Sequence, residues 1–255
     1  MIFMDFKNKT VLVTGGSRGI GKAIAMAFAD HGARVAITYV SNDQAAEDTL
    51  NGLPGGPHMK YKADISNDQE ILTMVEAVIH QLGSIDILVN NAGIYIKHPV
   101  ATMDFDDWQN AWKRILDVNL TGPANLCYHA ARQMIRQGGG KIINISSRGA
   151  FRGEPEYVAY GASKAGLNSM SQSLAKELAP HNIYVGVIAP GFVETDMAKQ
   201  FLEGPMGDEI RNQSPLKRAA RPEEIAHAVL MFAAEGAEYM TGSIIDVNGA
   251  SYLRS

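Results

Sequence analysis

The chain has 255 residues, of which 46% are hydrophobic and 20% are charged, and its formal net charge is −4. This balance is typical of a globular protein with a large core, and it excludes the basic surface expected of a nucleic-acid-binding protein. The lone Cys127 excludes an intramolecular disulfide and fits a reducing compartment. Asp5 and Lys7 interrupt the N-terminal apolar residues before a signal peptide could form, and no apolar run reaches the length of a membrane span. We therefore expect a cytoplasmic protein that binds neither nucleic acid nor membranes.

The first elements predict a strand, a glycine-rich turn, a helix and a second strand. The β-branched run 10–13 leads into the sequence TGGSRGIG at 14–21. A helical pattern follows over 22–30, and a second β run covers 34–38. In such a unit, glycines let backbone N–H groups approach a pyrophosphate at the helix N-terminus, where the helix dipole favours negative charge. The glycines do not follow the G-x-G-x-x-G spacing, so a plain glycine-rich turn is the alternative interpretation.

The next unit places an acidic residue at the end of a strand. Residues 42–53 are predicted to form a helix, and 58–62 the third strand. Asp64 and Ile65 follow directly, where open α/β sheets place ligand contacts. The alternative is that Asp64 caps the helix predicted over 68–82.

Two stretches of amide residues follow. A fourth strand over 85–89 runs into the sequence NNAG at 90–93, where small and amide side chains can bond the backbone of neighbouring strands, although a simple turn is the alternative. A long helical pattern then covers 106–137, and its apolar stripe contains one amide, Asn119. If the stripe is buried, this amide must be buried with a hydrogen-bonding partner.

Three further strands complete the pattern, over 141–145, 184–189 and 243–247. Strands that alternate with helices throughout predict an α/β fold, a doubly wound parallel sheet of about seven strands with helices on both faces. No linker, repeat or low-complexity tract interrupts the chain, so we expect a single domain over 1–255.

The stretch after the sixth strand is predicted to cover the substrate. Residues 192–206 include Met197, Phe201 and Leu202, and they belong to an expected lid around 192–216. The alternative is an amphipathic helix packed as ordinary core.

One pair of residues suggests chemistry. Tyr160 and Lys164 lie in a helical pattern that runs to Ala179, so both side chains should lie on one helical face, one turn apart. A phenol has a pKa of about 10 in water, and an ammonium about 4 Å away would lower it by roughly 3 units at an effective dielectric of ~20. Such a shift suits a proton donor or acceptor at neutral pH. The alternative is a half-buried tyrosine beside a solvated lysine.

Seven sequence blocks together resemble the short-chain dehydrogenase/reductase family over essentially the whole chain. They are TGGSRGIG at 14–21, DI at 64–65, NNAG at 90–93, DVNLTG at 117–122, the serine pair at 146–147, YGASK at 160–164 and PGFVETDM at 190–197. Any one block is common, but the set in this order and spacing is highly specific. The resemblance implies a Rossmann fold, a nicotinamide cofactor and an oxidoreductase acting on CH–OH groups.

The resemblance also implies which residues are catalytic. Tyr160 is then the general acid/base, and Lys164 lowers its pKa and holds the nicotinamide ribose. Ser147 orients the carbonyl group, and Asn119 holds a water molecule in the proton relay.

Two neighbouring residues are not expected to take part. Of the serine pair, Ser146 is structural by the same resemblance. Tyr157 is the other candidate phenol, but Gly161 occupies the position where its lysine would stand, so we reject it.

The resemblance places the cofactor along the glycine turn and the strand ends. The corresponding cofactor-binding residues are Gly15, Ser17, Arg18, Gly19, Ile20, Gly21, Tyr39, Asp64, Ile65, Asn91, Ala92, Gly93, Tyr160, Lys164, Pro190, Gly191, Val193 and Thr195. Family members that prefer NAD carry an acidic residue at the end of the second strand, where this chain has Thr38-Tyr39 and nothing acidic until Asp43. Arg18 can meet a 2′-phosphate, or it is a solvated loop residue. We expect NADP(H), with NAD possible.

The implied reaction is hydride transfer from a reduced nicotinamide to a ketone carbon, with Tyr160 protonating the alkoxide. No metal is expected, because no cluster of His, Cys and carboxylate residues has ligand spacing. The chain most resembles the 3-oxoacyl-carrier-protein reductase group, which implies a small carbonyl or acyl thioester substrate. It departs from that group where the carrier-docking arginines correspond to Gly138 and His181, and where the segment 93–119 is longer.

Two alternatives remain open. One is an NAD(P)-dependent dehydrogenase of a sugar, polyol or other secondary alcohol. The other is a non-catalytic nucleotide-sensing regulator on the same fold. By resemblance we also expect a homotetramer, built through the helices at 106–137 and 157–179 with a second contact near the C-terminal strand.

Overall fold

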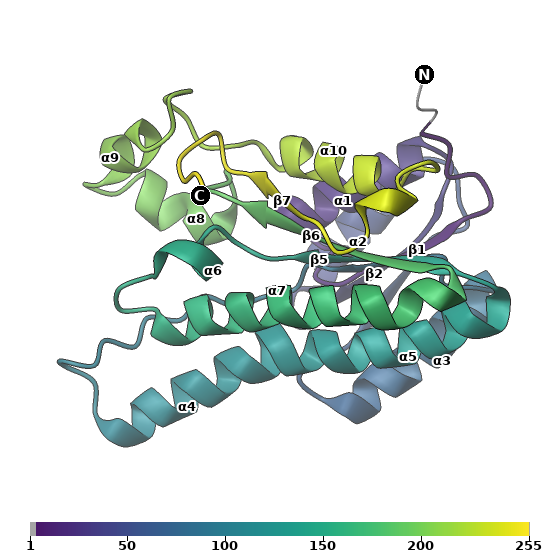
Figure 1. The fold of residues 1–255 in the computed structure, drawn as a ribbon, viewed down its shortest axis with the longest axis horizontal. Coiled ribbons are helices and arrows are strands. Elements are labelled where there is room, and N and C mark those ends of the chain that lie inside the picture. The colour runs from purple at the N-terminus through teal and green to yellow at the C-terminus, as the bar shows by residue number, and fades with distance from the viewer. Residues whose placement is uncertain (1–3, 255) are drawn as a thin grey trace.

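The computed structural model describes residues 4–254, which form one parallel sheet between two layers of helices (Figure 1). The seven strands lie in the order β3-β2-β1-β4-β5-β6-β7, and every neighbouring pair is parallel. They are β1 Thr10–Val13, β2 Arg34–Tyr39, β3 Met59–Lys62, β4 Ile87–Asn90, β5 Gly140–Ile145, β6 Ile183–Pro190 and β7 Ile244–Val247. The predicted fold class is therefore confirmed. The ends of the predicted domain, 1–3 and 255, lie outside the described residues, as does the start of the N-terminal segment considered as a signal peptide.

The inner strands are buried on both faces, because alternate residues enter different cores, whereas the edge strands β3 and β7 are partly exposed. Val11 and Val13 of β1 join the core beneath α1, α2 and α10, whereas Leu12 joins the core beneath α3, α5 and α7. The helices are α1 Gly19–Asp30, α2 Asp43–Gly52, α3 Asp68–Leu82, α4 Phe105–Leu116, α5 Gly122–Gln137, α6 Gly149–Arg152, α7 Val158–Leu178, α8 Asp196–Leu202, α9 Gly207–Asn212 and α10 Pro222–Ala233. Burial on both faces explains why inner strands such as β1 and β4 are mostly apolar.

The predicted helix over 106–137 is wrong as a single element. It is divided into α4 and α5 by a π-helical turn, Asp117–Thr121, that contains Asn119. Pro123 lies four residues after Asn119 and has no N–H to donate to its carbonyl, so regular α-helical bonding cannot continue through this point. The division places a buried amide where the hydrogen-bond pattern of the helix changes.

Two other predicted helices differ in their bounds. The helix expected from Lys22 begins at Gly19, so two glycines of the turn belong to its first turn, where no apolar periodicity could reveal them. The stretch 192–206 is not one helix, since α8 ends at Leu202 and α9 begins at Gly207. The strands agree with their predicted ranges to within two residues.

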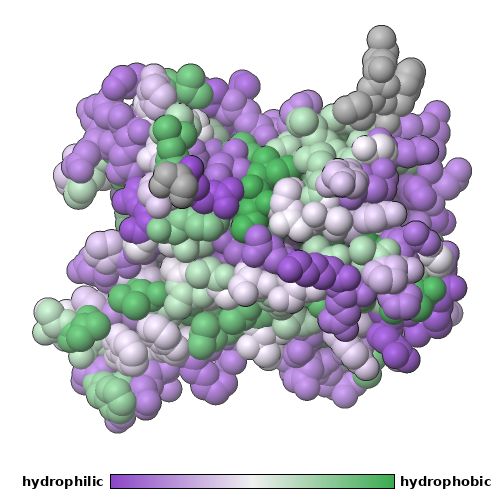
Figure 2. Space-filling model, in the orientation of Figure 1, coloured by the Kyte–Doolittle hydropathy of each residue, from purple (hydrophilic) through white to green (hydrophobic). Residues whose placement is uncertain are grey.

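On the face drawn in Figure 2, hydrophobic residues lie scattered among hydrophilic ones. No helix within residues 4–254 is long and apolar enough to cross a membrane.

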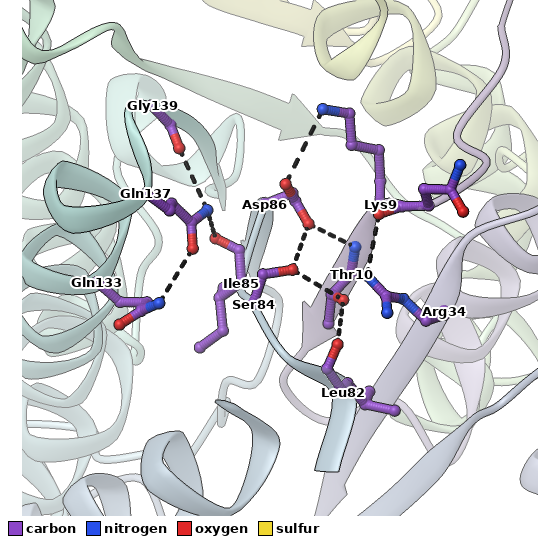
Figure 3. Close-up of polar contacts among 11 residues, drawn as sticks. Lys9, Thr10, Arg34, Leu82, Ser84, Ile85, Asp86, Gln133, Gln137 and Gly139 are labelled. Atoms are coloured by element: carbon purple, nitrogen blue, oxygen red, sulfur yellow. Dashed lines mark hydrogen bonds and ion pairs between the residues drawn. The ribbon is translucent and has the colours of Figure 1, made fainter. Parts of the chain in front are cut away.

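The amino ends of β1 and β4 are held together by one carboxylate (Figure 3). Asp86 accepts hydrogen bonds from the backbone N–H of Thr10 at 2.8 Å and from the hydroxyl of Ser84 at 2.8 Å. The ammonium of Lys9 lies 3.9 Å from its other oxygen. This cluster is at the opposite edge of the sheet from the carboxyl ends of the strands, so it contributes to stability and not to any site there.

We expect Asp86→Ala to lower the free energy of unfolding by about 1–3 kcal/mol, because it leaves the buried N–H of Thr10 without its acceptor. For a chain of this size, each kcal/mol shifts the midpoint of thermal unfolding by about 2–4 °C, which calorimetry resolves. Asp30→Ala removes an exposed carboxylate from the end of α1 and serves as the control. Equal midpoints for the two variants would show that the carboxylate of Asp86 does not hold the strands together.

Candidate active site

A cleft of about 890 Å³ opens at the carboxyl ends of the strands. The strand order reverses here, because β2 lies on one side of β1 and β4 on the other, and open α/β sheets bind ligands at this point. Every predicted cofactor-binding residue lines the cleft, and so do Ser147, Tyr160 and Lys164. The structure therefore brings these residues together, while their roles stay predictions.

The glycine turn comes close to the backbone around it. Gly15 and Gly19 have φ of +62° and +53°, in the left-handed region that favours glycine. A Cβ on Gly21 would lie 2.2 Å from the carbonyl oxygen of Gly15, so no side chain fits there. The turn thus presents backbone, not side chains, at the N-terminus of α1.

Two amides at the end of β4 hold neighbouring segments, and Asn91 holds this turn. The side chain of Asn91 donates to the carbonyl oxygens of Thr14 at 2.9 Å and Gly15 at 3.2 Å. Asn90 donates to the side chain of Asn144 on β5 at 2.8 Å. The prediction that NNAG bonds the backbone of a neighbouring strand is confirmed for Asn91, and the simple turn is the wrong alternative.

Asp64 does not cap the following helix. The N-cap of α3 is Asn67, whose side chain accepts from the backbone N–H groups of Gln69 and Glu70. Asp64 accepts from the backbone N–H of Ser66 at 2.9 Å and lies 2.9 Å from a guanidinium nitrogen of Arg114. Burial raises the pKa of Asp64, but the hydrogen bonds from Ser66 and Arg114 outweigh burial and hold it below its usual value. Asp64 is thus an ionised carboxylate on the wall of the cleft.

The end of β2 carries a phenol whose hydroxyl is already bonded. Tyr39 donates to the carboxylate of Asp43, which also accepts from the ammonium of Lys60 at 2.7 Å. At the other side of the cleft, the exposed guanidinium of Arg18 lies 3.6 Å from the carboxylate of Asp196. Asp43, the first acid after β2, is therefore already hydrogen-bonded, while the guanidinium of Arg18 lies exposed at the rim of the cleft.

Lys164 is buried, so the alternative of a solvated lysine is wrong. Its ammonium donates to the carbonyl oxygen of Ile145, the last residue of β5, at 2.8 Å and lies 5.9 Å from the centroid of the Tyr160 ring. Burial lowers the pKa of Lys164 to about 8. The ammonium is thereby fixed at the base of the cleft.

The pKa of Tyr160 does not shift as expected. Burial raises it above its usual value, a hydrogen bond with Ser147 opposes that shift, and the carboxylate of Glu154 adds to it. The expectation that Lys164 makes the phenol more acidic is therefore wrong for these residues by themselves. The desolvation of a phenol on the first turn of α7 exceeds the stabilisation of its anion.

Asn119 is fully buried and bonded, as its place in an apolar stripe predicted. It accepts from the backbone N–H of Ile94 at 2.8 Å and donates to the carbonyl oxygen of the same residue at 3.0 Å. It also donates to the hydroxyl of Ser163 at 3.3 Å. Asn119 therefore connects the segment after β4 to α7 from beneath the cleft.

Ser146 and Tyr157, which were not expected to take part in the reaction, have other contacts, although Ser146 also lines the cleft. Ser146 is buried, and its hydroxyl donates to the carbonyl oxygen of Lys164 at 3.4 Å. Tyr157 stacks on Tyr95, with ring centroids 3.8 Å apart.

The expected lid borders the cleft and also forms a small core. Met197 and Phe201 line the cleft, and Phe201 lies 5.9 Å from the ring of Tyr95. Ala198, which also lines the cleft, and Leu202 are buried with Ala219. The two interpretations of this stretch thus describe adjacent faces of one short helix.

Three residues beside the reacting groups were missed by the sequence analysis. Tyr95, Arg148 and Glu154 all line the cleft next to Ser147 and Tyr160. Only Arg148 had an indication in the sequence, since it directly follows the serine pair. The other two come from loops whose path the sequence does not predict.

Known proteins resemble this chain over nearly its full length. A family model described as enoyl-(acyl carrier protein) reductase matches residues 15–250. The chain is 40% identical over 252 residues to the 3-oxoacyl-[acyl-carrier-protein] reductase FabG of Aquifex aeolicus, covering 98% of this chain and 99% of that protein. A solved short-chain dehydrogenase/reductase of Brucella melitensis, described as glucose/ribitol dehydrogenase, is 34% identical with a TM-score of 0.90, and 100% of each chain is covered. A short-chain dehydrogenase of Burkholderia cenocepacia in complex with NADP is 31% identical with a TM-score of 0.88, covering 96% of this chain and 98% of that one.

The buried ammonium predicts a pH dependence of stability. Lys164 has a pKa of about 8 when folded, whereas a lysine in an unfolded chain titrates near 10.4. Between these values the unfolded chain holds more protons on this residue, so the free energy of unfolding rises with pH. Relative to Lys164→Met, the wild type should gain up to about 3 kcal/mol between pH 8 and about pH 10, measured by urea unfolding.

Lys176→Met is the control for this comparison, because Lys176 is an exposed lysine of the same helix. Its difference from the wild type should stay constant over the same range. A constant difference for Lys164→Met as well would contradict the burial of a charged ammonium at this position.

Proposed function

The chain belongs to the short-chain dehydrogenase/reductase family and is an oxidoreductase acting on CH–OH groups, and from this premise we propose that it reduces a ketone to a secondary alcohol with NADPH. The observation that carries the proposal is that Ser147, Tyr160 and Lys164 line the same cleft as the glycine turn. A proton donor, a carbonyl-orienting hydroxyl and a phosphate-binding turn are the parts that this reaction requires.

The shape of the cleft supports a bound dinucleotide. The space beside Gly15 and Gly21 excludes side chains, so backbone N–H groups can meet a pyrophosphate at the start of α1. Asp64 would hold the adenine end, and Asn91 keeps the turn in the required conformation. Pro190, Gly191 and Thr195, among the other predicted cofactor-binding residues, would hold the nicotinamide end.

The surroundings of β2 support NADP over NAD. A carboxylate at the end of β2 would bond the ribose hydroxyls of NAD, whereas the first acid after β2 is Asp43, four residues beyond Tyr39, and its Oδ1 already accepts from Tyr39 and Lys60. Arg18 has an exposed guanidinium at the rim and can exchange its contact with Asp196 for a 2′-phosphate. The NADP complex of the Burkholderia cenocepacia relative agrees with this preference.

Each catalytic side chain has one task in the proposed reaction. When bound, the cofactor supplies a hydride to the carbonyl carbon. Ser147 donates to the carbonyl oxygen and orients it, and Tyr160 gives its proton to that oxygen as negative charge develops. The phenol of Tyr160, whose pKa lies above its usual value, is protonated at neutral pH and so carries the proton that reduction requires. Lys164, fixed by Ile145, directs its remaining N–H donors toward the ribose and the phenolate.

We propose a 3-oxoacyl thioester as the substrate. The aromatic rings of Tyr95, Phe192 and Phe201 give the substrate end of the cleft an apolar wall that fits an acyl chain, and the Aquifex aeolicus relative is a 3-oxoacyl reductase. Gly138 and His181 replace the arginines expected for carrier docking, so the test compares free and carrier-bound thioesters. The relative described as glucose/ribitol dehydrogenase makes oxidation of a sugar or polyol the second candidate.

We further propose that the protein is a single-domain cytoplasmic homotetramer. Tyr128 and Ile135 of α5 and Val158 of α7 are large hydrophobic residues with exposed side chains, on the helices expected to form the contact. Light scattering would give the mass of four chains, and the mass of one chain would contradict this assembly.

The first experiment follows NADPH oxidation, with NADH in parallel, against acetoacetyl-CoA, an acetoacetyl carrier protein and a panel of ketones and ketoses. We expect turnover of the thioesters and a higher kcat/KM with NADPH than with NADH. Oxidation of a polyol without reduction of any thioester would favour the second candidate. Cofactor binding without turnover of any member would favour a nucleotide-sensing regulator.

Tyr160→Phe should lower kcat by about 10²–10⁴ without abolishing cofactor binding, because it removes the proton donor and little else. Tyr157→Phe is the matched control, since it removes a phenol hydroxyl from the same turn of chain, and it should retain turnover. Full activity of Tyr160→Phe would contradict the catalytic assignment.

A further inference from the structure

A buried arginine stands next to the carbonyl-orienting serine. Arg148 follows Ser147 directly, lines the same cleft and is 4% exposed. Adjacent Cα atoms are about 3.8 Å apart, so its side chain starts beside the reacting groups. None of the predicted catalytic or cofactor-binding tasks uses it.

The guanidinium of Arg148 is held only by neutral acceptors. It donates to the hydroxyl of Ser251 at 2.6 Å and to the side-chain oxygen of Gln213 at 2.5 Å, and it lies 5.0 Å from the centroid of the Phe192 ring. Among residues 4–254, no carboxylate lies within 4.0 Å of it. A cation removed from water without an anionic partner is costly, so such a residue usually has a ligand to meet.

The charge of Arg148 persists in this environment. Burial, followed by the nearby Arg152, lowers the pKa of Arg148 to about 10, which leaves the guanidinium charged at neutral pH. The carboxylate of Glu154 also borders the cleft, but its closest cation is Arg152, at 3.9 Å. The three residues together carry one net positive charge at the wall of the cleft.

Several distant parts of the chain hold Arg148, through its backbone and through its guanidinium. The backbone N–H of Arg148 donates to Pro190 at the end of β6, Gln213 follows α9, and Ser251 belongs to the C-terminal segment. That segment lies beside α6 (Figure 1), where the hydroxyl of Tyr252 donates to the carbonyl oxygen of Phe151 at 3.3 Å. A donor held from so many sides is pre-organised for a fixed acceptor.

We infer that Arg148 is a specificity residue that donates to an acyl oxygen of the substrate, located two carbons from the ketone that is reduced. A guanidinium only donates, and two of its five N–H groups are used by Ser251 and Gln213. Its planar fork suits a thioester carbonyl or a carboxylate better than scattered hydroxyls. The inference rests on the proposed ketone reduction and names the group that distinguishes the substrate.

The test compares kcat/KM for acetoacetyl-CoA and acetoacetate with kcat/KM for cyclohexanone, a ketone without an acyl oxygen. Arg148→Met should lower the ratio of acyl substrate to cyclohexanone about ten- to hundredfold, the range of a charge-assisted hydrogen bond. Arg148→Lys should recover part of the loss. Because both kcat/KM values are measured on the same variant, any loss of folded protein lowers both equally and leaves their ratio unchanged.

Arg152→Met is the matched control, because Arg152 is an exposed arginine that donates to the same Gln213 at 3.4 Å. Its ratio should stay near that of the wild type. Equal losses in the two variants would show that only the positive field matters and would overturn the inference. An unchanged ratio in Arg148→Met would overturn it as well.

Calorimetric binding separates this inference from the proposed function. Acetoacetate and acetoacetyl-CoA are titrated into the wild type and Arg148→Met in the presence of NADP. Weaker binding of the thioester alone assigns the acceptor to a thioester carbonyl, and weaker binding of the free acid alone assigns it to a carboxylate; both support the inference. Equal affinities overturn it, whereas absence of turnover with weakened binding contradicts only the proposed function.

Discussion

When a parallel sheet is covered by helices on both faces, polar side chains can reach a ligand only at the ends of its strands. Val11 and Val13 fill one core and Leu12 fills the other, so no position along β1 can present chemistry to solvent. The candidate catalytic and cofactor-binding groups lie at the carboxyl edge, where the strand order reverses, while Asp86 secures the opposite edge. This constraint explains why one cleft collects residues from Gly15 to Thr195.

The loops at that edge are held by buried amides and one buried ammonium. Asn91 satisfies two carbonyl groups of the glycine turn, Asn119 bonds both backbone groups of Ile94, and Lys164 donates to Ile145 at the end of β5. Beyond the end of a strand, backbone N–H and C=O groups have no partner in the sheet, and each of these contacts supplies one there. The same contacts determine where Ser147 and Tyr160 lie, so stability and the geometry of the site depend on the same residues.

The sequence predicted what depends on local pattern and missed what depends on tertiary contact. Apolar runs gave every strand to within two residues, and the seven blocks identified the lining of the cleft. The break at Asn119 was missed, because the apolar stripe continues through the π-helical turn and only Pro123 marks the change in hydrogen bonding. The direction of the pKa shift of Tyr160 depends on burial, which spacing to Lys164 does not reveal. Arg148 acquires meaning only when Gln213 and Ser251, far away in the sequence, are seen to hold it.

The central claim is that this cleft brings a reduced nicotinamide and a ketone together at Tyr160. The most direct measurement is a crystal structure of the chain grown with NADP and a non-reacting substrate analogue. We expect the pyrophosphate on the turn at Gly15–Gly21, the ribose within hydrogen-bond distance of Lys164, and the nicotinamide facing the hydroxyl of Tyr160. A nucleotide bound elsewhere, or a nicotinamide ring directed away from Tyr160, would contradict it.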